Sequence, residues 1–272
     1  MIANEPSPRH QVASDRPFLA AMVALGGSYL LLIAAMLWAD ISFLSPADLW
    51  DTLAREEVMF SLRLSLFTCT AAALLSLLVA VPLAYLMTRV RSRWLEVVEL
   101  LVDIPVVLPP LVIGLSLLIL FQSSVGRAIE SVIPVTFEVP AIILAQFTVA
   151  CAFSVRTMIV SFQQLHPRTE DVALTLGCSR AQAFFRVVLP GVERGMVTAF
   201  TLAWARSLGE FGPILVFAGV TRMRTEVLPT TVFLELNVGN IEAAVAASLL
   251  MITAAAVVLT LARLFGQKGA VR

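Results

Sequence analysis

The chain has 272 residues, of which 59% are hydrophobic and only 14% are charged, and its formal net charge is zero. A soluble globular domain is about 45–50% apolar and about 25% charged, so this composition excludes an ordinary water-soluble protein and indicates a polytopic membrane protein. There is no basic surplus of the kind that predicts nucleic-acid binding. The cysteines, Cys69, Cys151 and Cys178, form no CxxC or Cys/His pattern and predict neither a disulfide framework nor a metal site.

Apolar stretches divide the chain into six predicted transmembrane spans. Residues 1–17, with three prolines and mixed charges, predict a cytoplasmic N-terminal tail. The first span could instead be a signal peptide, but about twenty apolar residues exceed the usual apolar core of one, and no clear small-residue cleavage site follows. Each span is long enough to cross about 30 Å of hydrocarbon. The expected spans are 18–38, 60–87, 97–121, 140–162, 196–218 and 241–265, in an all-α membrane domain over 18–265 with a cytoplasmic tail over 266–272.

Basic residues predict the orientation of these spans. If the N-terminus is cytoplasmic, the inner segments hold twelve basic residues and the outer loops hold four, as the positive-inside rule requires. Both termini and the loop 165–191 are then expected in the cytoplasm. The inner set is Arg9, Arg16, Arg89, Arg91, Arg93, Arg168, Arg180, Arg186, Arg194, Arg263, Lys268 and Arg272, and the outer set is Arg55, Arg127, Arg222 and Arg224.

The longest polar interruption is residues 165–191, LHPRTEDVALTLGCSRAQAFFRVVLPG. Thr169 is suited to be the N-cap of a first short helix, and Glu170 and Asp171 would then lie in its first turn, where the helix dipole favours negative charge. Gly177 supplies a natural stop for this helix.

A second short helix is predicted directly after this glycine. Ser179 and Gln182 have the spacing of a capping box, and Pro190 is expected to close the helix that they open. Residues 165–191, called the knob below, are therefore predicted to be two helices hinged at a glycine rather than a flexible linker.

The knob resembles the EAA loop of bacterial and archaeal ABC importer permeases. That pattern is Glu-Ala-Ala, three residues, Gly, nine residues, Ile, one residue, Leu-Pro, and its spacing is kept throughout, with Asp171, Val172 and Val187 in place of the Glu, the second-position Ala and the Ile. An amphipathic loop without a partner is the alternative. The resemblance implies that an ATPase docks on the knob, with coupling residues Asp171, Ala173, Leu174, Gly177, Ser179, Phe184, Leu189 and Pro190.

Helix-breaking residues interrupt the third span in DIPVVLPPLVIG, which also contains Asp103. Prolines remove backbone donors, and carbonyls freed at membrane depth need protein or water partners. The break at Pro109 and Pro110 is therefore expected to be buried in the bundle or to line a cavity. A simple packing kink and a role in the transport pathway both remain open.

The fifth span contains two charges, Arg206 and Glu210, in WARSLGEFGPILVFAG. Four residues apart, they are expected to share one helix face and to pair, beside a helix weakened at Gly212. A structural ion pair and a pathway or gating role are both open, whereas direct substrate binding by Arg206 is disfavoured because Glu210 would neutralise it. Arg63 and Arg156 are expected to extend toward the membrane surfaces and are assigned no ligand role.

These stretches extend the resemblance. LPPLVIG, SVRTM, SLGEFGPILVFAG and TEVLP are similar to segments of the molybdate, tungstate and sulfate branch of these permeases. The resemblance implies a multi-pass inner-membrane permease that pairs with a second permease subunit, docks two ABC ATPase subunits and receives substrate from an extracytoplasmic binding protein. It also implies alternating access. No cofactor would be bound by this chain, and ATP and Mg would lie on the ATPase. Permeases for iron, polyamines or thiamine share the loop and remain possible.

The source of energy separates the remaining alternatives. The chain has no GxxxxGK[ST] phosphate-binding loop, so it must be driven by an ion gradient or by another polypeptide. A gradient-driven secondary transporter is the main alternative, but no clear internal repeat is visible and Glu210 has a partner. An intramembrane enzyme is disfavoured because no Ser/His or paired-carboxylate arrangement is apparent.

Overall fold

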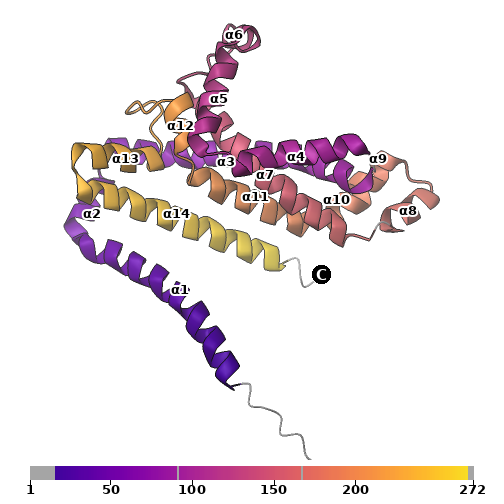
Figure 1. The fold of residues 1–272 in the computed structure, drawn as a ribbon, viewed down its shortest axis with the longest axis horizontal. Coiled ribbons are helices and arrows are strands. Elements are labelled where there is room, and N and C mark those ends of the chain that lie inside the picture. Colours follow the sequence, from indigo (N-terminus) through magenta and orange to yellow (C-terminus); the bar gives the residue numbers. More distant parts are fainter. Residues whose placement is uncertain (1–15, 91, 167, 269–272) are drawn as a thin grey trace, which may run out of the picture. The chain divides into compact units, whose positions relative to one another are not determined.

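The computed structural model describes residues 16–90, 92–166 and 168–268, which are helical and contain no strand (Figure 1). The chain divides into two units, residues 1–45 and 46–272. The first unit contains α1 (Arg16–Phe43), which begins two residues before the first expected span. The second unit contains α2 (Pro46–Leu53), α3 (Glu56–Arg89), α4 (Arg93–Val107), α5 (Pro110–Gln122), α6 (Ser124–Glu130), α7 (Val139–Gln164), α8 (Arg168–Thr175), α9 (Arg180–Ala183), η1 (Phe184–Val188), α10 (Leu189–Gly191), α11 (Glu193–Leu208), α12 (Gly212–Phe217), α13 (Leu228–Val238) and α14 (Ile241–Lys268).

Four of the six predicted spans are single helices within the described residues. These are α1, α3, α7 and α14, each long and apolar enough to cross a membrane. The sixth span extends to Lys268, three residues into the predicted C-terminal tail, and the rest of that tail lies outside the described residues. The third and fifth spans are broken, and their breaks shape the rest of the bundle.

Small side chains form the main interface of the bundle, where α3 packs against α7 and both pack against α11. Without a hydrophobic driving force in lipid, transmembrane helices associate through close van der Waals contact, which small residues permit. Alanine and serine recur on the buried faces of α3 and α7 accordingly. The buried positions of α3 are Val58, Ser61, Ser65, Thr68, Cys69, Ala72, Ala73, Ser76, Ala80 and Ala84.

The third span is not one helix but two, because α4 and α5 meet at an angle of 115°. Leu108 and Pro109 between them have extended ψ angles of 139° and 135°. Proline at positions 109 and 110 accounts for the break, since each lacks a backbone donor and restricts the residue before it to extended conformations. The fifth span is also broken, into α11 and the short α12, at residues 209–211.

The two breaks pack against each other. Pro110 of α5 contacts Gly212 of α12, and Pro213 of α12 contacts Gly114 of α5. A Cβ atom added at Gly212 would lie 2.9 Å from Cβ of Pro110, and one added at Gly114 would lie 2.8 Å from Cα of Pro213. Both distances are shorter than real carbon–carbon contacts. The glycines are therefore required by the close approach of α5 and α12, which lie side by side in Figure 1.

We expect Gly114→Ala to destabilise the protein despite the better helix propensity of alanine. The new methyl group would meet the backbone of Pro213, which cannot rotate away, and overpacking of this kind costs about 1–3 kcal/mol. Thermal unfolding in detergent should show the loss. The matched control is Gly27→Ala in α1, where nothing lies within 4 Å of the added atom, and equal unfolding temperatures for the two variants would contradict the packing argument.

Candidate functional site

The paired breaks line an open cavity of about 390 Å³. It contains every residue that the sequence associated with a pathway or gate: Pro109, Pro110, Arg206, Glu210 and Gly212, with Leu111, Gly209, Phe211 and Leu215 completing the lining. The third and fifth spans thus line one cavity, at the point where the helical hydrogen bonding of both is interrupted.

Arg206 and Glu210 form the predicted ion pair, with Nη1 of the arginine 2.7 Å from Oε1 of the glutamate. They do not share one helix face, because α11 ends at Leu208 and Glu210 lies in the break. The carboxylate is buried, with a side-chain exposure of 1%, whereas the arginine is 35% exposed. The guanidinium also lies over the ring of Phe153, 5.8 Å from its centroid. The pair therefore presents a partly accessible cation that is held by a buried anion.

Arg156 does not extend alone toward a membrane surface, contrary to expectation. Its Nε donates to Oδ1 of Asp103 at 2.8 Å and its Nη1 donates to Oε1 of Glu99 at 2.7 Å, while Nη2 also contacts Asp103. Glu99 and Asp103 lie four residues apart on α4, so they share one face, and that spacing was a signal in the sequence. Arg63 is exposed on α3.

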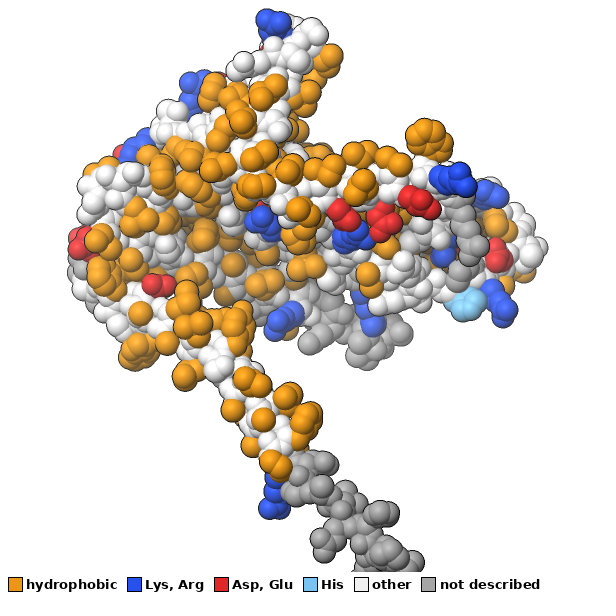
Figure 2. Space-filling model, viewed as in Figure 1, with side chains coloured by type: hydrophobic (Ala, Val, Ile, Leu, Met, Phe, Trp, Pro, Cys, Tyr) orange, Lys and Arg blue, Asp and Glu red, His pale blue; other side chains and the backbone are white. Residues whose placement is uncertain are grey.

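All three side chains of this cluster are partly exposed, and Figure 2 shows acidic and basic side chains adjoining among hydrophobic ones in the region of α4 and α7. Charges at membrane depth face water, protein or one another rather than lipid. This face of α4 and α7 is therefore unsuited to contact with lipid tails.

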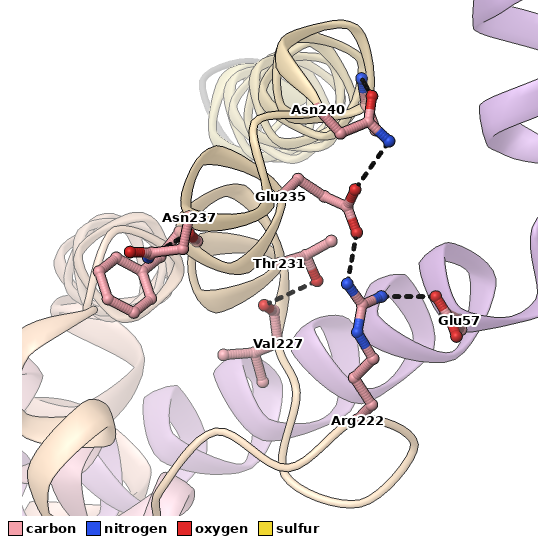
Figure 3. Close-up of polar contacts among 9 residues, drawn as sticks. Glu57, Arg222, Val227, Thr231, Glu235, Asn237 and Asn240 are labelled. Carbon is pink, nitrogen blue, oxygen red and sulfur yellow. Dashed lines mark hydrogen bonds and ion pairs between the residues drawn. The ribbon is translucent and has the colours of Figure 1, made fainter.

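A second polar network joins the segment after α12 to the ends of three helices. Figure 3 shows Arg222 between Glu57 of α3 and Glu235 of α13, at 2.5 Å and 2.7 Å. Nδ2 of Asn240 donates to the other oxygen of Glu235 at 3.0 Å. The hydrogen bond to Glu235 raises the pKa of Arg222, and burial raises the pKa of the nearby Glu226 carboxyl. These contacts hold the start of α3 against α13 at the end of the bundle away from the knob.

The first half of the knob is the helix α8, and it begins one residue before the expected cap. Thr169 is not the N-cap but lies within α8, and its N–H donates to the carbonyl of His166 at 3.0 Å. The ring of His166 instead accepts from the N–H of Arg168 through Nδ1, at 3.2 Å. Glu170 and Asp171 lie in the first turn as predicted. Gly177 has a φ of +91°, the left-handed conformation expected of a C-terminal glycine.

The second half of the knob begins with the predicted capping box. The N–H of Ser179 donates to Oε1 of Gln182 at 2.9 Å, and the N–H of Gln182 donates to Oγ of Ser179 at 3.3 Å. The helix does not close at Pro190. It widens into the π-helical turn η1, in which the N–H of Leu189 donates to the carbonyl of Phe184, and continues to Gly191. The wider turn accommodates a proline that would otherwise clash with the preceding turn.

The predicted coupling residues divide into a buried and an exposed set. Ala173 is buried, and Leu174, Phe184 and Leu189 are partly buried, so they hold the knob together. The exposed members are Asp171, Gly177, Ser179 and Pro190. Large apolar side chains accompany them on the surface, namely Val172, Leu176 and Phe185.

One contact of the knob was not apparent in the sequence. The hydroxyl of Tyr85 on α3 donates to Oε1 of Glu170 at 2.5 Å, and Nε of Arg89 lies 3.3 Å from Oε2. Tyr85 and Glu170 are separated by 85 residues in the chain, so no local pattern connects them. In the part of the chain that the structure describes, no group of His, Cys, Asp or Glu side chains is arranged to hold a metal ion.

Residues 80–269 match the family model of the "Binding-protein-dependent transport system inner membrane component". The chain belongs to this family. It is 36% identical over 212 residues to the "Molybdenum transport system permease protein ModB" of Mycobacterium tuberculosis, covering 77% of this chain and 80% of that protein. It is 30% identical over 270 residues to the "Sulfate transport system permease protein CysT" of Escherichia coli, covering 94% and 98%.

A solved structure has the same fold. A chain of the crystal structure of a bacterial ABC transporter involved in the import of the acidic polysaccharide alginate matches with a TM-score of 0.75 and 17% identity, over 93% of this chain and 96% of that one. This match confirms the expected all-α fold, and the family match with the relatives above confirms a multi-pass inner-membrane permease of an ABC importer. As a member of this family, the permease is a transport subunit rather than an enzyme, and it works with ATPase subunits and a binding protein.

We expect the loss of stability to be larger for Arg206→Ala than for Glu210→Ala. Arg206→Ala leaves a buried carboxylate without its counter-ion, a change that costs about 3–5 kcal/mol. Glu210→Ala leaves a partly exposed guanidinium that water can reach, so the loss of stability should be smaller. The double variant should be more stable than the sum of the singles implies. Thermal unfolding of the four proteins in detergent measures this, and strictly additive effects would show that the two residues are not coupled.

Proposed function

We propose that this permease imports a tetrahedral divalent oxyanion, namely molybdate, tungstate or sulfate. Two observations support this proposal: the relatives named above are molybdenum and sulfate permeases, and the segments LPPLVIG and SLGEFGPILVFAG resemble that branch. Those same segments form the two packed breaks and the cavity between them. A permease for iron, a polyamine or thiamine is the alternative within the family.

The knob is the surface on which the ATPase docks. Its preformed helices and its exposed apolar side chains support this assignment. The knob is capped, its hinge glycine has nothing within 4 Å of an added Cβ, and three large apolar side chains are exposed around it. Exposed apolar groups on a preformed element are typical of a protein interface. This permease itself binds no cofactor, and ATP and Mg²⁺ are held by the ATPase.

The knob and both termini face the cytoplasm. The asymmetry of basic residues supports this orientation, because twelve lie in the segments assigned to that side and four in the outer loops. The Arg222 network then lies on the outer side, where the binding protein delivers substrate.

The path for substrate runs along the faces that cannot contact lipid. The cavity at the two breaks and the charged face of α4 and α7 both belong to this path, and Pro109, Pro110, Gly212 and the Arg206–Glu210 pair form a gate within it. A second permease subunit completes the path. ATP binding closes the ATPase subunits, the knobs move with them, and the permeases rotate from an inward-open to an outward-open state.

The source of energy and the ligand can be tested together in liposomes. We expect no uptake by the permease alone, and ATP-dependent uptake of radiolabelled molybdate, tungstate or sulfate once the ATPase and binding protein encoded with it are added. Uptake by the lone permease in a proton or sodium gradient would favour a secondary transporter. Stimulation only by iron, a polyamine or thiamine would overturn the oxyanion assignment.

Gly177→Val should release or uncouple the ATPase while leaving the membrane helices intact. A branched side chain at a φ of +91° costs roughly 1–2 kcal/mol or more, which distorts the hinge between the two helices of the knob. Asp171→Ala should act in the same direction but more weakly, since an exposed charge at a helix start is worth about 0.3–1 kcal/mol. Pull-down of the ATPase, ATP hydrolysis and uptake measure both variants.

The matched control for this experiment is Gly239→Val. Gly239 has a φ of +82°, nothing lies within 4 Å of an added Cβ, and it lies at the end of α13, far from the knob in the sequence. It should carry a similar backbone strain and still bind the ATPase. Wild-type binding and uptake by Gly177→Val would mean that the knob is not the coupling element.

A further inference from the structure

The two halves of the knob are attached to the membrane helices in different ways. In the second half, Val188 is fully buried in a hydrophobic cluster with Ala80 and Ala84 of α3, Phe162 of α7 and Ala199 of α11. In the first half, Ala173 is the buried member of α8, and α8 packs against η1 and α9. The second half is thus part of the core, whereas α8 lies outside it.

Within the described residues, a polar cluster joins α8 to α3. Glu170 uses both carboxylate oxygens there, one accepting from the Tyr85 hydroxyl at 2.5 Å and the other 3.3 Å from Nε of Arg89. The side chains of Arg89 and Glu170 are only 15% and 12% exposed. Hydrogen bonds to charged groups are about twice as strong as neutral ones. The Glu170 carboxylate therefore points inward to α3, away from the exposed surface that Val172 and Leu176 present.

Tyr85 connects the same cluster to the rest of the bundle. Its ring packs edge-on against Phe184 of η1 and Phe162 of α7, with centroids 4.8 Å and 5.8 Å away. Beside these contacts, an open pocket of about 650 Å³ lies between α3 and the helices α8 and α9, lined among others by Pro82, Leu86 and Arg180. Contact between α8 and α3 is thus concentrated at Glu170 instead of being spread along the helix.

The chain itself does not link the knob to α3. The knob follows α7 and leads into α11, so a displacement of α8 reaches α3 only through side-chain contacts. Without such a contact, α8 would be held by its packing against η1 and α9, and a force on its exposed face could turn it about the open Gly177 hinge. Rigid-body coupling needs packed contacts with defined geometry.

We propose that Tyr85, Arg89 and Glu170 are positioning residues that fasten α8 to α3, so that movement of the knob displaces α3 rather than turning α8 about its hinge. This inference rests on the proposed function, in which an ATPase moves the knob. It assigns to Glu170 a role distinct from docking, because its carboxylate is turned toward α3 and not toward the partner.

The test is the number of substrate ions imported per ATP hydrolysed by the complete complex in proteoliposomes. Glu170→Gln and Arg89→Gln remove the ionic part, and Tyr85→Phe removes the hydroxyl while keeping the ring. Each should bind the ATPase and hydrolyse ATP as the wild type does, yet import less substrate per ATP. For Tyr85→Phe and Glu170→Gln, which weaken the charge-assisted hydrogen bond, the loss should be about tenfold. Arg89→Lys, which keeps the charge, should retain most of the coupling.

Controls separate this role from simple stability. Glu193→Gln removes an exposed carboxylate from the first turn of α11 and should leave the ratio unchanged. The Glu170→Gln/Arg89→Gln double variant should be no worse than the poorer single one, since both break the same contact. If Glu170→Gln does not assemble, Tyr85→Phe tests the same bond with the packing kept.

The outcomes are distinct. Unchanged uptake per ATP in all three variants, or losses of uptake, ATPase binding and thermal stability in equal proportion, would overturn the fastening role. Absence of ATP-driven uptake by the wild-type complex would instead overturn the proposed function itself.

Discussion

Much of this molecule depends on the packing of two broken helices against each other. In each of them a proline contacts a glycine of the other. Gly114 accepts Pro213, and Gly212 accepts Pro110, at distances that exclude any side chain. Breaks at membrane depth expose backbone groups that lipid cannot satisfy, and burying one break against another keeps both away from lipid. The same contact creates the hollow beside Arg206 and Glu210. The breaks that interrupt the third and fifth spans thus also form the candidate gate.

The helix α3 links the two ends of the membrane domain. It runs for 34 residues, about 50 Å at 1.5 Å per residue. An arginine–glutamate contact lies near each end, Glu57 with Arg222 in the first turn and Arg89 with Glu170 in the last. Between them its small side chains pack closely against α7. Although Pro82 lies in its interior, α3 is one unbroken helix, and because it is closely packed and held at both ends it can transmit displacement along its length.

Local signals in the sequence predicted local structure well. The Ser179–Gln182 capping box, the left-handed Gly177 and the four unbroken spans follow from residue types within a few positions of one another. Features that need distant partners were not predictable, as with Glu170 and Tyr85, because no periodicity relates their positions. Some local expectations were also wrong: the ring of His166 rather than Thr169 accepts from an N–H at the start of α8, a π-helical turn carries the chain through Pro190, and Glu210 lies in a break rather than on the helix face of Arg206.

The paired breaks have a consequence for how the protein is made. The half-helices α5 and α12 have 13 and 6 residues, too few to span a bilayer alone, which takes about 20. Neither can be released into lipid as an independent segment without exposing its open end. Because α5 precedes α12 in the chain, their packed pair can form only once the fifth span has been made. We therefore expect the third and fifth spans to assemble cooperatively rather than as separate helices.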